Sequence, residues 1–505
     1  MRTLSKSKLM AFRQCPKRLW LEIHRPELAT VSAGAQARFA EGHTVGAIAR
    51  SFYDPEGTGV LIDPVAQGHA GAMQRSQELL QAKTVAPLFE AGFSDGRVMA
   101  YADVLLPVPT KRGRKWRMVE VKSSAQVKDY HREDVAVQAY AARAAGVDIE
   151  SVALAHIDSS WTYPGGGDYR GLLVEEDLTT DVAALAPEVP VWVDEAHKIA
   201  QRRTAPKIAT GAQCTTPFDC GFIDHCQQGQ VAAEFPVAWL PRVQTKALRS
   251  HLDEPGVQDL RDVPNDLLNE RQLRVKVHTL SGQVFFDATR AAAELAQHSR
   301  PAYFLDFETV QLAVPIWKGT RPYQQIPFQF SVHRISRTGQ LTHGEFLQLD
   351  GSDPSRSFAE ALIAACGRKG PVFVYNAGFE SSRIKELAQR FPRLRAELLL
   401  IQGRLVDLMR VAEACYYHPD QQGSWSIKKV LPTIAPDLDY GALSGVQDGT
   451  MAMQAFVEAA IDPHTTAERR SAIDAELRAY CRLDTLAMVR IWQYFSGHSK
   501  PIEVT

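Results

Sequence analysis

PAYFLDFET, residues 301–309, opens the segment that decides the fold class of the second half of the chain. Its aromatic and aliphatic residues favour a β-strand over 302–308. Further strands are predicted at 327–334 and 371–376, and helices at 356–366, 378–390 and 466–494. Because strands and helices follow one another in this order, we predict a mixed α/β sheet for this half.

The first half of the chain also mixes helix and strand. Residues 8–23, KLMAFRQCPKRLWLEI, place apolar side chains at helical spacing, and a second helix is predicted at 131–145. Strands are predicted at 97–108 (RVMAYADVLLPV), 116–124 (WRMVEVKSS) and 150–158 (ESVALAHID). A polar, proline-marked stretch separates the two halves of the chain. We therefore predict three segments: an N-terminal domain at 1–230, a helical connector at 231–297 and a C-terminal domain at 298–505.

The composition is that of a globular protein. The chain has 505 residues, of which 45% are hydrophobic and 23% are charged, and its net charge is −1. These values exclude a disordered, collagen-like or disulfide-scaffold chain, and any polyanionic partner must be met by a local basic patch. We find neither a run of about 18 apolar residues nor a signal-peptide pattern, so we expect a cytoplasmic protein without a membrane partner.

Asp103, Glu120 and Lys122 form the first group of candidate site residues. Glu120 and Lys122 point to the same face of a strand because they are two positions apart, and Asp103 lies on the preceding strand. Two carboxylates beside a lysine suit Mg²⁺ or Mn²⁺, which would hold a phosphate and activate water while the lysine positions the nucleophile. The alternative is an edge strand with exposed charges.

This part of the chain resembles the RecB-like branch of the PD-(D/E)XK nucleases. The resemblance implies a restriction-endonuclease-like fold with Asp103 and Glu120 as metal ligands and Lys122 as the catalytic lysine. It also matches Gln138 to the glutamine of the family's following helix. The family's tyrosine four residues later is Ala142 here, and Tyr140 is offset by two positions. His43 is out of register with the family's upstream metal-binding histidine, so we do not assign it.

A basic stretch lies between the two strands of this group. Its cations can neutralise phosphates and its tryptophan can stack on a base, although a solvated hairpin tip is an equal alternative. The candidate nucleic-acid-binding residues are Lys111, Arg112, Arg114, Lys115, Trp116 and Arg117.

Four of the seven cysteines form a second group. Cys214, Cys220 and Cys226 are evenly spaced in a polar segment, and Cys15 lies far upstream next to a proline. Four thiolates suit an iron–sulfur cluster or zinc, and the absence of a C-x-x-C knuckle disfavours zinc. This arrangement, with one cysteine before the predicted nuclease core and three after it, resembles that of the iron–sulfur RecB-like nucleases, which include CRISPR-associated exonucleases. The resemblance implies a structural 4Fe–4S cluster on these four residues. Cys366, Cys415 and Cys481 are predicted to be packing residues.

Carboxylates in the second half form a third group. Asp306 and Glu308 share one face of their strand, and Tyr480 and Asp484 share one face of the last helix. Glu380 follows a later strand, and Asp407 is a weaker candidate. Carboxylates from separate segments can converge on two metal ions that stabilise the attacking and leaving oxygens of a phosphodiester. The alternative is a strand end and a solvated helix face.

The order of these motifs resembles the DnaQ-like 3′–5′ exonucleases with a tyrosine in the third motif, on an RNase H-like fold. The resemblance implies that Asp306, Glu308, Glu380 and Asp484 hold metal and that Tyr480 orients the attacking water. Glu380 stands where the family has aspartate. Together with the N-terminal resemblance it implies a metal-dependent nuclease that acts on DNA rather than RNA, in repair or in defence. The alternatives are a nucleic-acid-binding or assembly module with one inactive site, and an RNA-trimming exonuclease.

Overall fold

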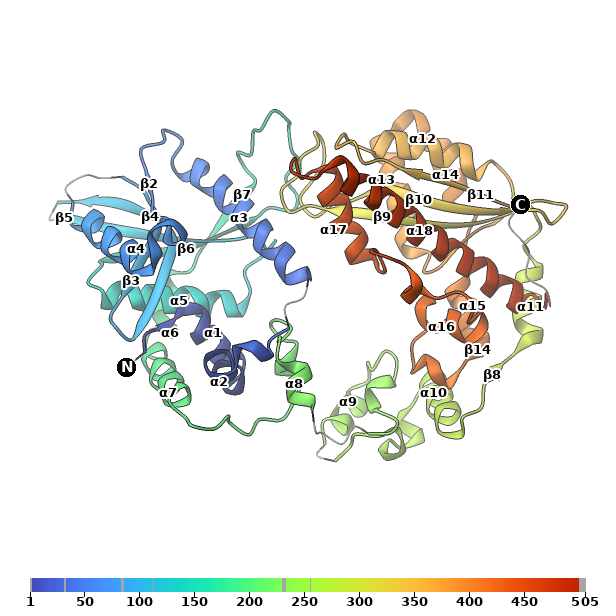
Figure 1. Ribbon diagram of the computed structural model, residues 1–505, viewed down its shortest axis with the longest axis horizontal. Coiled ribbons are helices and arrows are strands. Elements are labelled where there is room, and N and C mark those ends of the chain that lie inside the picture. Colours follow the sequence, from blue (N-terminus) through green and yellow to red (C-terminus); the bar gives the residue numbers. More distant parts are fainter. Residues whose placement is uncertain are drawn as a thin grey trace. The chain divides into compact units, whose positions relative to one another are not determined.

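The computed structural model describes residues 2–30, 33–82, 86–111, 113–228, 233–254 and 256–498, with the backbone alone for 33–40 and 113 (Figure 1). The chain forms two compact units. Unit 1 comprises Met1–Gln230 and Leu312–Gln324, and unit 2 comprises Val231–Gln311 and Gln325–Thr505. Both units combine sheets with helices, so the prediction of a mixed α/β architecture is confirmed.

Unit 1 is built on a sheet with the strand order β2-β3-β4-β5-β6-β7, and β1 also pairs with β4. Its strands are β1 (Leu4–Ser5), β2 (Val60–Leu61), β3 (Leu88–Ser94), β4 (Val98–Thr110), β5 (Gly113–Lys122), β6 (Ile149–Ile157) and β7 (Leu173–Asp177). The pairs β3–β4 and β4–β5 are antiparallel, whereas β5 and β6 are parallel. Parallel neighbours need a crossover connection, and α5 (Asp129–Ala144) supplies it with Val135 and Val137 fully buried.

The helices of unit 1 include a break that the sequence explains. Residues 8–23 form two helices, α1 (Lys6–Gln14) and α2 (Pro16–His24), rather than one. Cys15 between them is extended, with φ −162° and ψ 119°, because a residue before proline is disfavoured in the helical region. The other helices are α3 (Ala33–Tyr53), α4 (Pro64–Gln81), α6 (Thr179–Leu185), α7 (Val189–Ala200) and α8 (Ile223–Gln227).

Unit 2 contains a sheet with the strand order β11-β10-β9-β12-β13. Its strands are β9 (Ala302–Gln311), β10 (Gln325–Ile335), β11 (Leu341–Leu347), β12 (Val372–Val374) and β13 (Leu405–Asp407). The pairs β11–β10 and β10–β9 are antiparallel, and β12 runs parallel to both β9 and β13. The helices are α12 (Ser355–Cys366), α13 (Gly378–Arg390), α14 (Arg395–Gln402), α15 (Leu408–Cys415), α16 (Ile427–Ile434), α17 (Gly449–Ala460) and α18 (Ala467–Phe495).

Helices cover both faces of this sheet, and the alternation along β9 separates the two faces. Tyr303, Leu305 and Phe307 pack in the apolar cluster that includes Phe358 of α12. Phe304 faces the opposite way, into the cluster that includes Trp492 of α18. Because Asp306 and Glu308 continue the alternation of Phe304, they belong to the face that α18 covers.

The division into compact units differs from the expected domain organisation in two places. The stretch 231–297 belongs to unit 2 and is not a separate connector. Its elements are α9 (Lys246–Leu252), α10 (Glu270–Ser281), β8 (Phe285–Phe286) and α11 (Ala288–Ala296). Leu248, Val275 and Leu295 are buried in the same apolar cluster as Trp492, and β8 pairs with β14 (Tyr416–Tyr417).

The second departure lies between β9 and β10. Residues 312–324 fall inside the expected C-terminal domain, yet they belong to unit 1. Ala313 and Val314 pack there with Val45 and Ala49 of α3 and with Leu172. The apolar side chains of this connection therefore complete the core of the first unit rather than that of the second.

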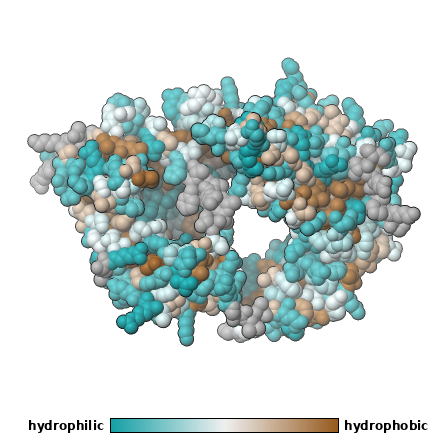
Figure 2. All heavy atoms as spheres, viewed as in Figure 1, coloured by the Kyte–Doolittle hydropathy of each residue, from teal (hydrophilic) through white to brown (hydrophobic). Residues whose placement is uncertain are grey.

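One face of the molecule carries mostly hydrophilic side chains. On the face seen in Figure 2, teal side chains predominate and apolar side chains form small patches among them. No helix in the described part of the chain is long and apolar enough to cross a membrane.

Candidate metal centres

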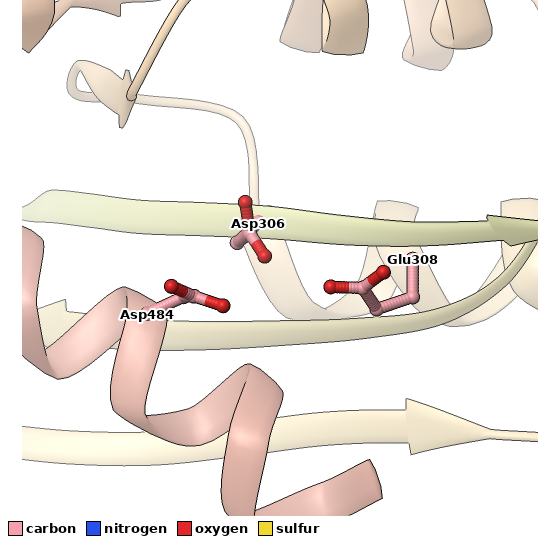
Figure 3. Close-up of side chains that lie close together, drawn as sticks. All are labelled: Asp306, Glu308 and Asp484. Atoms are coloured by element: carbon pink, nitrogen blue, oxygen red, sulfur yellow. The ribbon is translucent and has the colours of Figure 1, made fainter. Parts of the chain in front are cut away.

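The face of β9 that points to α18 ends in two carboxylates, Asp306 and Glu308. A third, Asp484, reaches them from α18. One carboxylate oxygen of each residue lies within 4.8 Å of the other two. Figure 3 shows the three side chains directed into the same space between the strand and the helix. The strand alternation and the helix spacing thus bring together three of the four metal ligands predicted for this half.

Burial raises the pKa of all three carboxylates, and the charge of Asp484 adds to this effect in the other two. Burial, followed by the charge of Asp484, raises the pKa of Asp306 and of Glu308 well above the ordinary values, and burial raises the pKa of Asp484 to about 6. Glu308 and Asp484 are 7% and 6% exposed. Like charges at this spacing need protons or a cation between them. Three oxygen donors suit Mg²⁺ or Mn²⁺, so the residues present fit such an ion.

Glu380, the fourth predicted ligand, stays outside this group. It lies on α13, is 2% exposed, and its Oε2 has no hydrogen-bond partner. Burial raises its pKa to about 8. Its charge also raises the pKa of Asp306, so it lies close enough to act on the cluster. The structure therefore assigns Glu380 to the surroundings of the carboxylate group rather than to the group itself.

Asp407, the weaker candidate, has a positioning role. Its carboxylate accepts the backbone N–H of Asn376 at 3.1 Å and of Ala377 at 3.2 Å. It also caps α15 by accepting the N–H of Met409. These bonds hold the turn that leads into α13, where Asn376 adopts a positive φ of 76°. Asp407 therefore fixes the start of the helix that carries Glu380.

Two tyrosines and a lysine surround the carboxylate group. The Tyr440 hydroxyl donates to Asp484 Oδ1 at 2.6 Å, and Tyr480 lies one turn before Asp484 on α18. Lys428 Nζ lies 5.3 Å from the centre of the Tyr440 ring and 5.2 Å from that of Tyr480. Its charge lowers the pKa of both Glu308 and Asp484. Sequence analysis missed Lys428 and Tyr440, because no spacing rule connects them to the carboxylate motifs.

The three cysteines that were predicted to be packing residues are confirmed as such. Cys366, Cys415 and Cys481 lie on α12, α15 and α18 and are fully buried. Cys481 is also next to the site, since its Sγ lies 3.8 Å from Asp306 Oδ2.

In unit 1 the predicted residues Asp103, Glu120 and Lys122 line one cavity of about 270 Å³. β4 supplies Asp103 and β5 supplies the other two. Asp103 Oδ2 accepts the backbone N–H of Val121 at 2.7 Å, which fixes it beside β5. Burial and the charge of Glu120 raise the pKa of Asp103 well above its ordinary value. The antiparallel pairing of the two strands thus produces the predicted grouping.

Glu120 is held by partners at both carboxylate oxygens. Lys122 Nζ lies 2.6 Å from Oε1, and Gln138 Nε2 donates to Oε2 at 2.5 Å. Burial alone would raise the pKa of Glu120, but the charges of Lys122 and Lys6 hold it below its usual range. Gln138 also donates to the carbonyl of Tyr101 at 2.9 Å. The glutamine predicted from the following helix therefore fixes the orientation of a candidate metal ligand.

Several residues of this cavity were missed. Lys6, Arg50 and Glu90 also line it, as does His43, which the sequence register had left unassigned. Asp134 joins Lys122 through an ion pair of 2.7 Å. Asp134 precedes Gln138 by one helical turn, so the shared face of α5 was a usable signal. Lys6 and Glu90 come from distant segments, and nothing in their sequence spacing links them to the site.

The basic stretch does not form the predicted surface for stacking on a base. Trp116 is 4% exposed and packs in the core of unit 1. Arg117 pairs with Glu175, and Lys115 lies 3.6 Å from Glu150. β4 and β5 continue to Thr110 and Gly113, so most of this stretch is strand, and alternation turns Trp116 inward. Lys111 is exposed at the turn, Arg114 lies against the Trp116 ring, and Arg112 falls outside the described residues.

The four cysteines of the second group line a single cavity of about 20 Å³ in unit 1, together with Lys17 and Arg18. Cys15 stands between α1 and α2, and Cys226 lies in α8. Among the described residues, no three of these sulfurs lie within 4.8 Å of one another. The donor set of four thiols fits a soft metal centre, either zinc or an iron–sulfur cluster.

The chain is similar, over residues 303–426, to a family described as a domain of unknown function (DUF2779). This stretch contains Asp306, Glu308, Glu380 and Asp407 and ends before α16, so Asp484 lies beyond it. A search of curated proteins found no significant match.

Proposed function

We propose that this protein is a metal-dependent nuclease that hydrolyses phosphodiester bonds of DNA at two sites. The site in unit 2 would be a DnaQ-like 3′–5′ exonuclease, and the site in unit 1 would be a RecB-like PD-(D/E)XK nuclease. The observation that carries the proposal is the cluster of Asp306, Glu308 and Asp484, whose oxygens lie within 4.8 Å of one another. Buried carboxylates at this spacing fit the paired-metal chemistry of phosphodiester hydrolysis.

In unit 2, Asp306, Glu308 and Asp484 would hold the metal ions. When bound, two divalent cations stabilise the attacking and leaving oxygens of an in-line displacement. Burial and the charge of Asp484 raise the pKa of Tyr480, so its hydroxyl remains a hydrogen-bond donor that can orient water. The Tyr440 hydroxyl donates to Asp484 Oδ1 and so holds this carboxylate in place.

In unit 1, Asp103 and Glu120 would hold a metal ion. Lys122 lies on the same face of β5 as Glu120 and would position the nucleophile. Gln138 keeps Glu120 in place through its bond to Oε2. The strand pairing that brings Asp103 to Glu120 supports a PD-(D/E)XK arrangement, and the mixed sheet with carboxylates under α18 supports an RNase H-like one.

We further propose that Cys15, Cys214, Cys220 and Cys226 bind a structural 4Fe–4S cluster. Support comes from the cavity of about 20 Å³ that all four cysteines line. The segments that carry these cysteines are already joined, since Gln14 Nε2 donates to the carbonyls of Gln213 and Phe218 at 2.8 and 2.7 Å. The cluster would close the long loop between residues 15 and 214.

A binding or assembly module with one inactive site is the second candidate. The observation that favours it is the position of Glu380 outside the carboxylate group. In that case unit 2 would bind nucleic acid without cutting it.

The proposal is tested with single-stranded DNA and RNA of one sequence, labelled at the 5′ end and incubated with Mn²⁺. The wild type should shorten DNA from its 3′ end. Asp306→Asn should slow this by more than about 100-fold, the upper loss seen for residues that only support a metal ligand. Lys122→Ala should leave the shortening intact and remove the remaining cleavage. The exposed residues Asp420 and Lys198 offer the matched controls Asp420→Asn and Lys198→Ala.

Three outcomes would contradict the proposal in different ways. Binding without shortening by the wild type favours the binding module. Faster loss of RNA than of DNA favours RNA trimming. A colourless anaerobic preparation that contains one zinc ion and no iron rejects the iron–sulfur cluster.

A further inference from the structure

Lys6 is a second lysine in the unit 1 cavity, and no motif assigns it. It is the first residue of α1, and its side chain is 22% exposed. Its Nζ lies 2.9 Å from Glu120 Oε1 and 3.2 Å from Asp134 Oδ2. Lys122 Nζ approaches the same two oxygens, at 2.6 and 2.7 Å. The two lysines and two carboxylates therefore form a closed ring of alternating charge.

This ring has a consequence for Lys122. Lys6 satisfies part of the negative charge of Glu120 and Asp134, so Lys122 does not have to balance both carboxylates alone. If Lys6 were removed, two carboxylates would compete for one ammonium group, and Lys122 would be drawn toward them and away from the cavity. Lys6 would thus leave the catalytic lysine available for substrate without itself contacting the reacting atoms.

The opposite end of the same helix lies at the cysteine cavity. Cys15 directly follows α1 and caps its C-terminus. Gln14 binds the carbonyls of Gln213 and Phe218, and Thr30 N–H donates to the carbonyl of Gly221 at 2.8 Å. A nine-residue helix spans about 13.5 Å and transmits a displacement of one end to the other. Leu9 and Phe12 are buried along it, which keeps the helix in one position.

We propose that Lys6 is a positioning residue of the unit 1 site, and that α1 makes its position depend on the four-cysteine cavity. The inference rests on the proposed nuclease function of unit 1. It assigns the cysteine cavity a second effect beyond closing a loop, because a centre that holds Cys15 also holds the ammonium group at the other end of the helix.

The first test compares Lys6→Ala and Lys6→Arg in an Asp306→Asn background, which silences unit 2. Two quantities are measured: cleavage of labelled DNA and the affinity for Mn²⁺ in the absence of DNA. Lys6→Ala should slow cleavage by about 10- to 100-fold, the range for residues that support a site. It should also tighten Mn²⁺ binding, because a competing cation has been removed. Lys6→Arg should restore cleavage in part.

The control is Lys8→Ala. Lys8 lies on the same helix, is 30% exposed, and pairs with Glu22 at 2.9 Å. It should change neither quantity. Slower cleavage with weaker Mn²⁺ binding in Lys6→Ala would show general damage to the fold and overturn the role of Lys6, as would unchanged cleavage. If the Asp306→Asn variant does not cleave DNA, the proposed nuclease function of unit 1 is wrong. An unchanged Mn²⁺ affinity in Lys6→Ala would independently overturn the role of Lys6.

The second test addresses the coupling through α1. Cys15→Ser should tighten Mn²⁺ binding as Lys6→Ala does and should accelerate amide hydrogen exchange over residues 5–14. Gln14→Ala keeps all four cysteines and should produce a smaller change in the same direction. In the Lys6→Ala/Cys15→Ser double variant the effects on Mn²⁺ affinity should not add, because both act through one ammonium group. Additive effects, or unchanged exchange in both single variants, would overturn the coupling.

Discussion

The two candidate centres balance their charges in opposite ways. In unit 1, Glu120 and Asp134 are each paired with two lysines, and the ring is satisfied by the protein alone. In unit 2, three carboxylates converge, and Lys428 Nζ donates to the backbone carbonyl of Gln447 at 2.6 Å. The first centre is therefore stabilised by its own side chains, whereas the second stores repulsion that a proton or a cation relieves. Both use carboxylates, but we expect a bound cation to stabilise the second centre more than the first.

The largest expected effect is a loss of stability when one carboxylate of the charged ring in unit 1 is removed. Glu120→Gln leaves Lys6 and Lys122 with one carboxylate fewer, and loss of a partner in a buried pair costs about 3–5 kcal/mol. Chemical unfolding of unit 1 should show this loss of free energy. Glu133→Gln removes a more exposed pair with Arg13 and should cost at most about 1 kcal/mol. Equal effects of the two variants would mean that the ring is not a buried, mutually dependent unit.

Addition of Mn²⁺ should stabilise unit 2. A ligand that binds only the folded state at 100 times its Kd contributes about 2.7 kcal/mol, and here it also relieves the repulsion among Asp306, Glu308 and Asp484. Thermal unfolding with and without Mn²⁺ measures the difference. Asp484→Asn should remove most of the stabilisation. A full Mn²⁺ response in this variant would locate the ion elsewhere.

Removal of one carboxylate should have opposite effects in the two units. Asp306→Asn deletes a repelling charge, so the metal-free protein should melt at a higher temperature even though its activity is lost. Each kcal/mol gained corresponds to about 2–4 °C for a unit of this size. Glu120→Gln, by contrast, lowers the melting temperature. A lower melting temperature for Asp306→Asn in the absence of metal would contradict the stored repulsion.

The metal-free form of unit 2 should lose stability as the pH rises. Burial raises the pKa of Asp484 to about 6 and that of Glu380 to about 8, above their ordinary values of 3.8 and 4.5. A group that binds its proton more tightly in the folded state contributes stability that is fully present below its unfolded pKa and is lost as the pH rises through the folded pKa. The decline should extend from about pH 4 to pH 8, and Glu380→Gln should flatten its upper part. Stability that rises between pH 6 and pH 8 would contradict these shifts.

The smallest expected effect concerns Lys428. Its charge lowers the pKa of Glu308 and Asp484, so Lys428→Ala should raise both. The pH at which Mn²⁺ binding is half lost should then move upward, by less than about one unit. Lys429→Ala, at the exposed neighbouring position, serves as the control. A shift to lower pH would show that Lys428 does not act through the carboxylates.

Local sequence patterns predicted the elements on which the site residues lie. Strand alternation placed Asp306 and Glu308 together, helix spacing placed Tyr480 with Asp484, and proline at position 16 explains the break that sets Cys15 at the end of α1. The prediction that Trp116 stacks on a base was wrong, because the two strands continue into the expected loop. The alternation of β5 then places the Trp116 side chain in the core. Lys6, Lys428 and Tyr440 could not be predicted, because tertiary packing brings them to the carboxylates from segments without a recognisable spacing. The resemblances to nucleases remain predictions.

The connection between β9 and β10 has a consequence for biosynthesis. Val45, Ala49 and Leu172 emerge early from the ribosome, but Ala313 and Val314, which pack against them, emerge much later. Domains usually fold as units during translation, with the N-terminal one first. Here the first unit completes its core only after residue 324 has been synthesised. The apolar surface around Val45, Ala49 and Leu172 therefore stays exposed until residues 312–324 can pack against it.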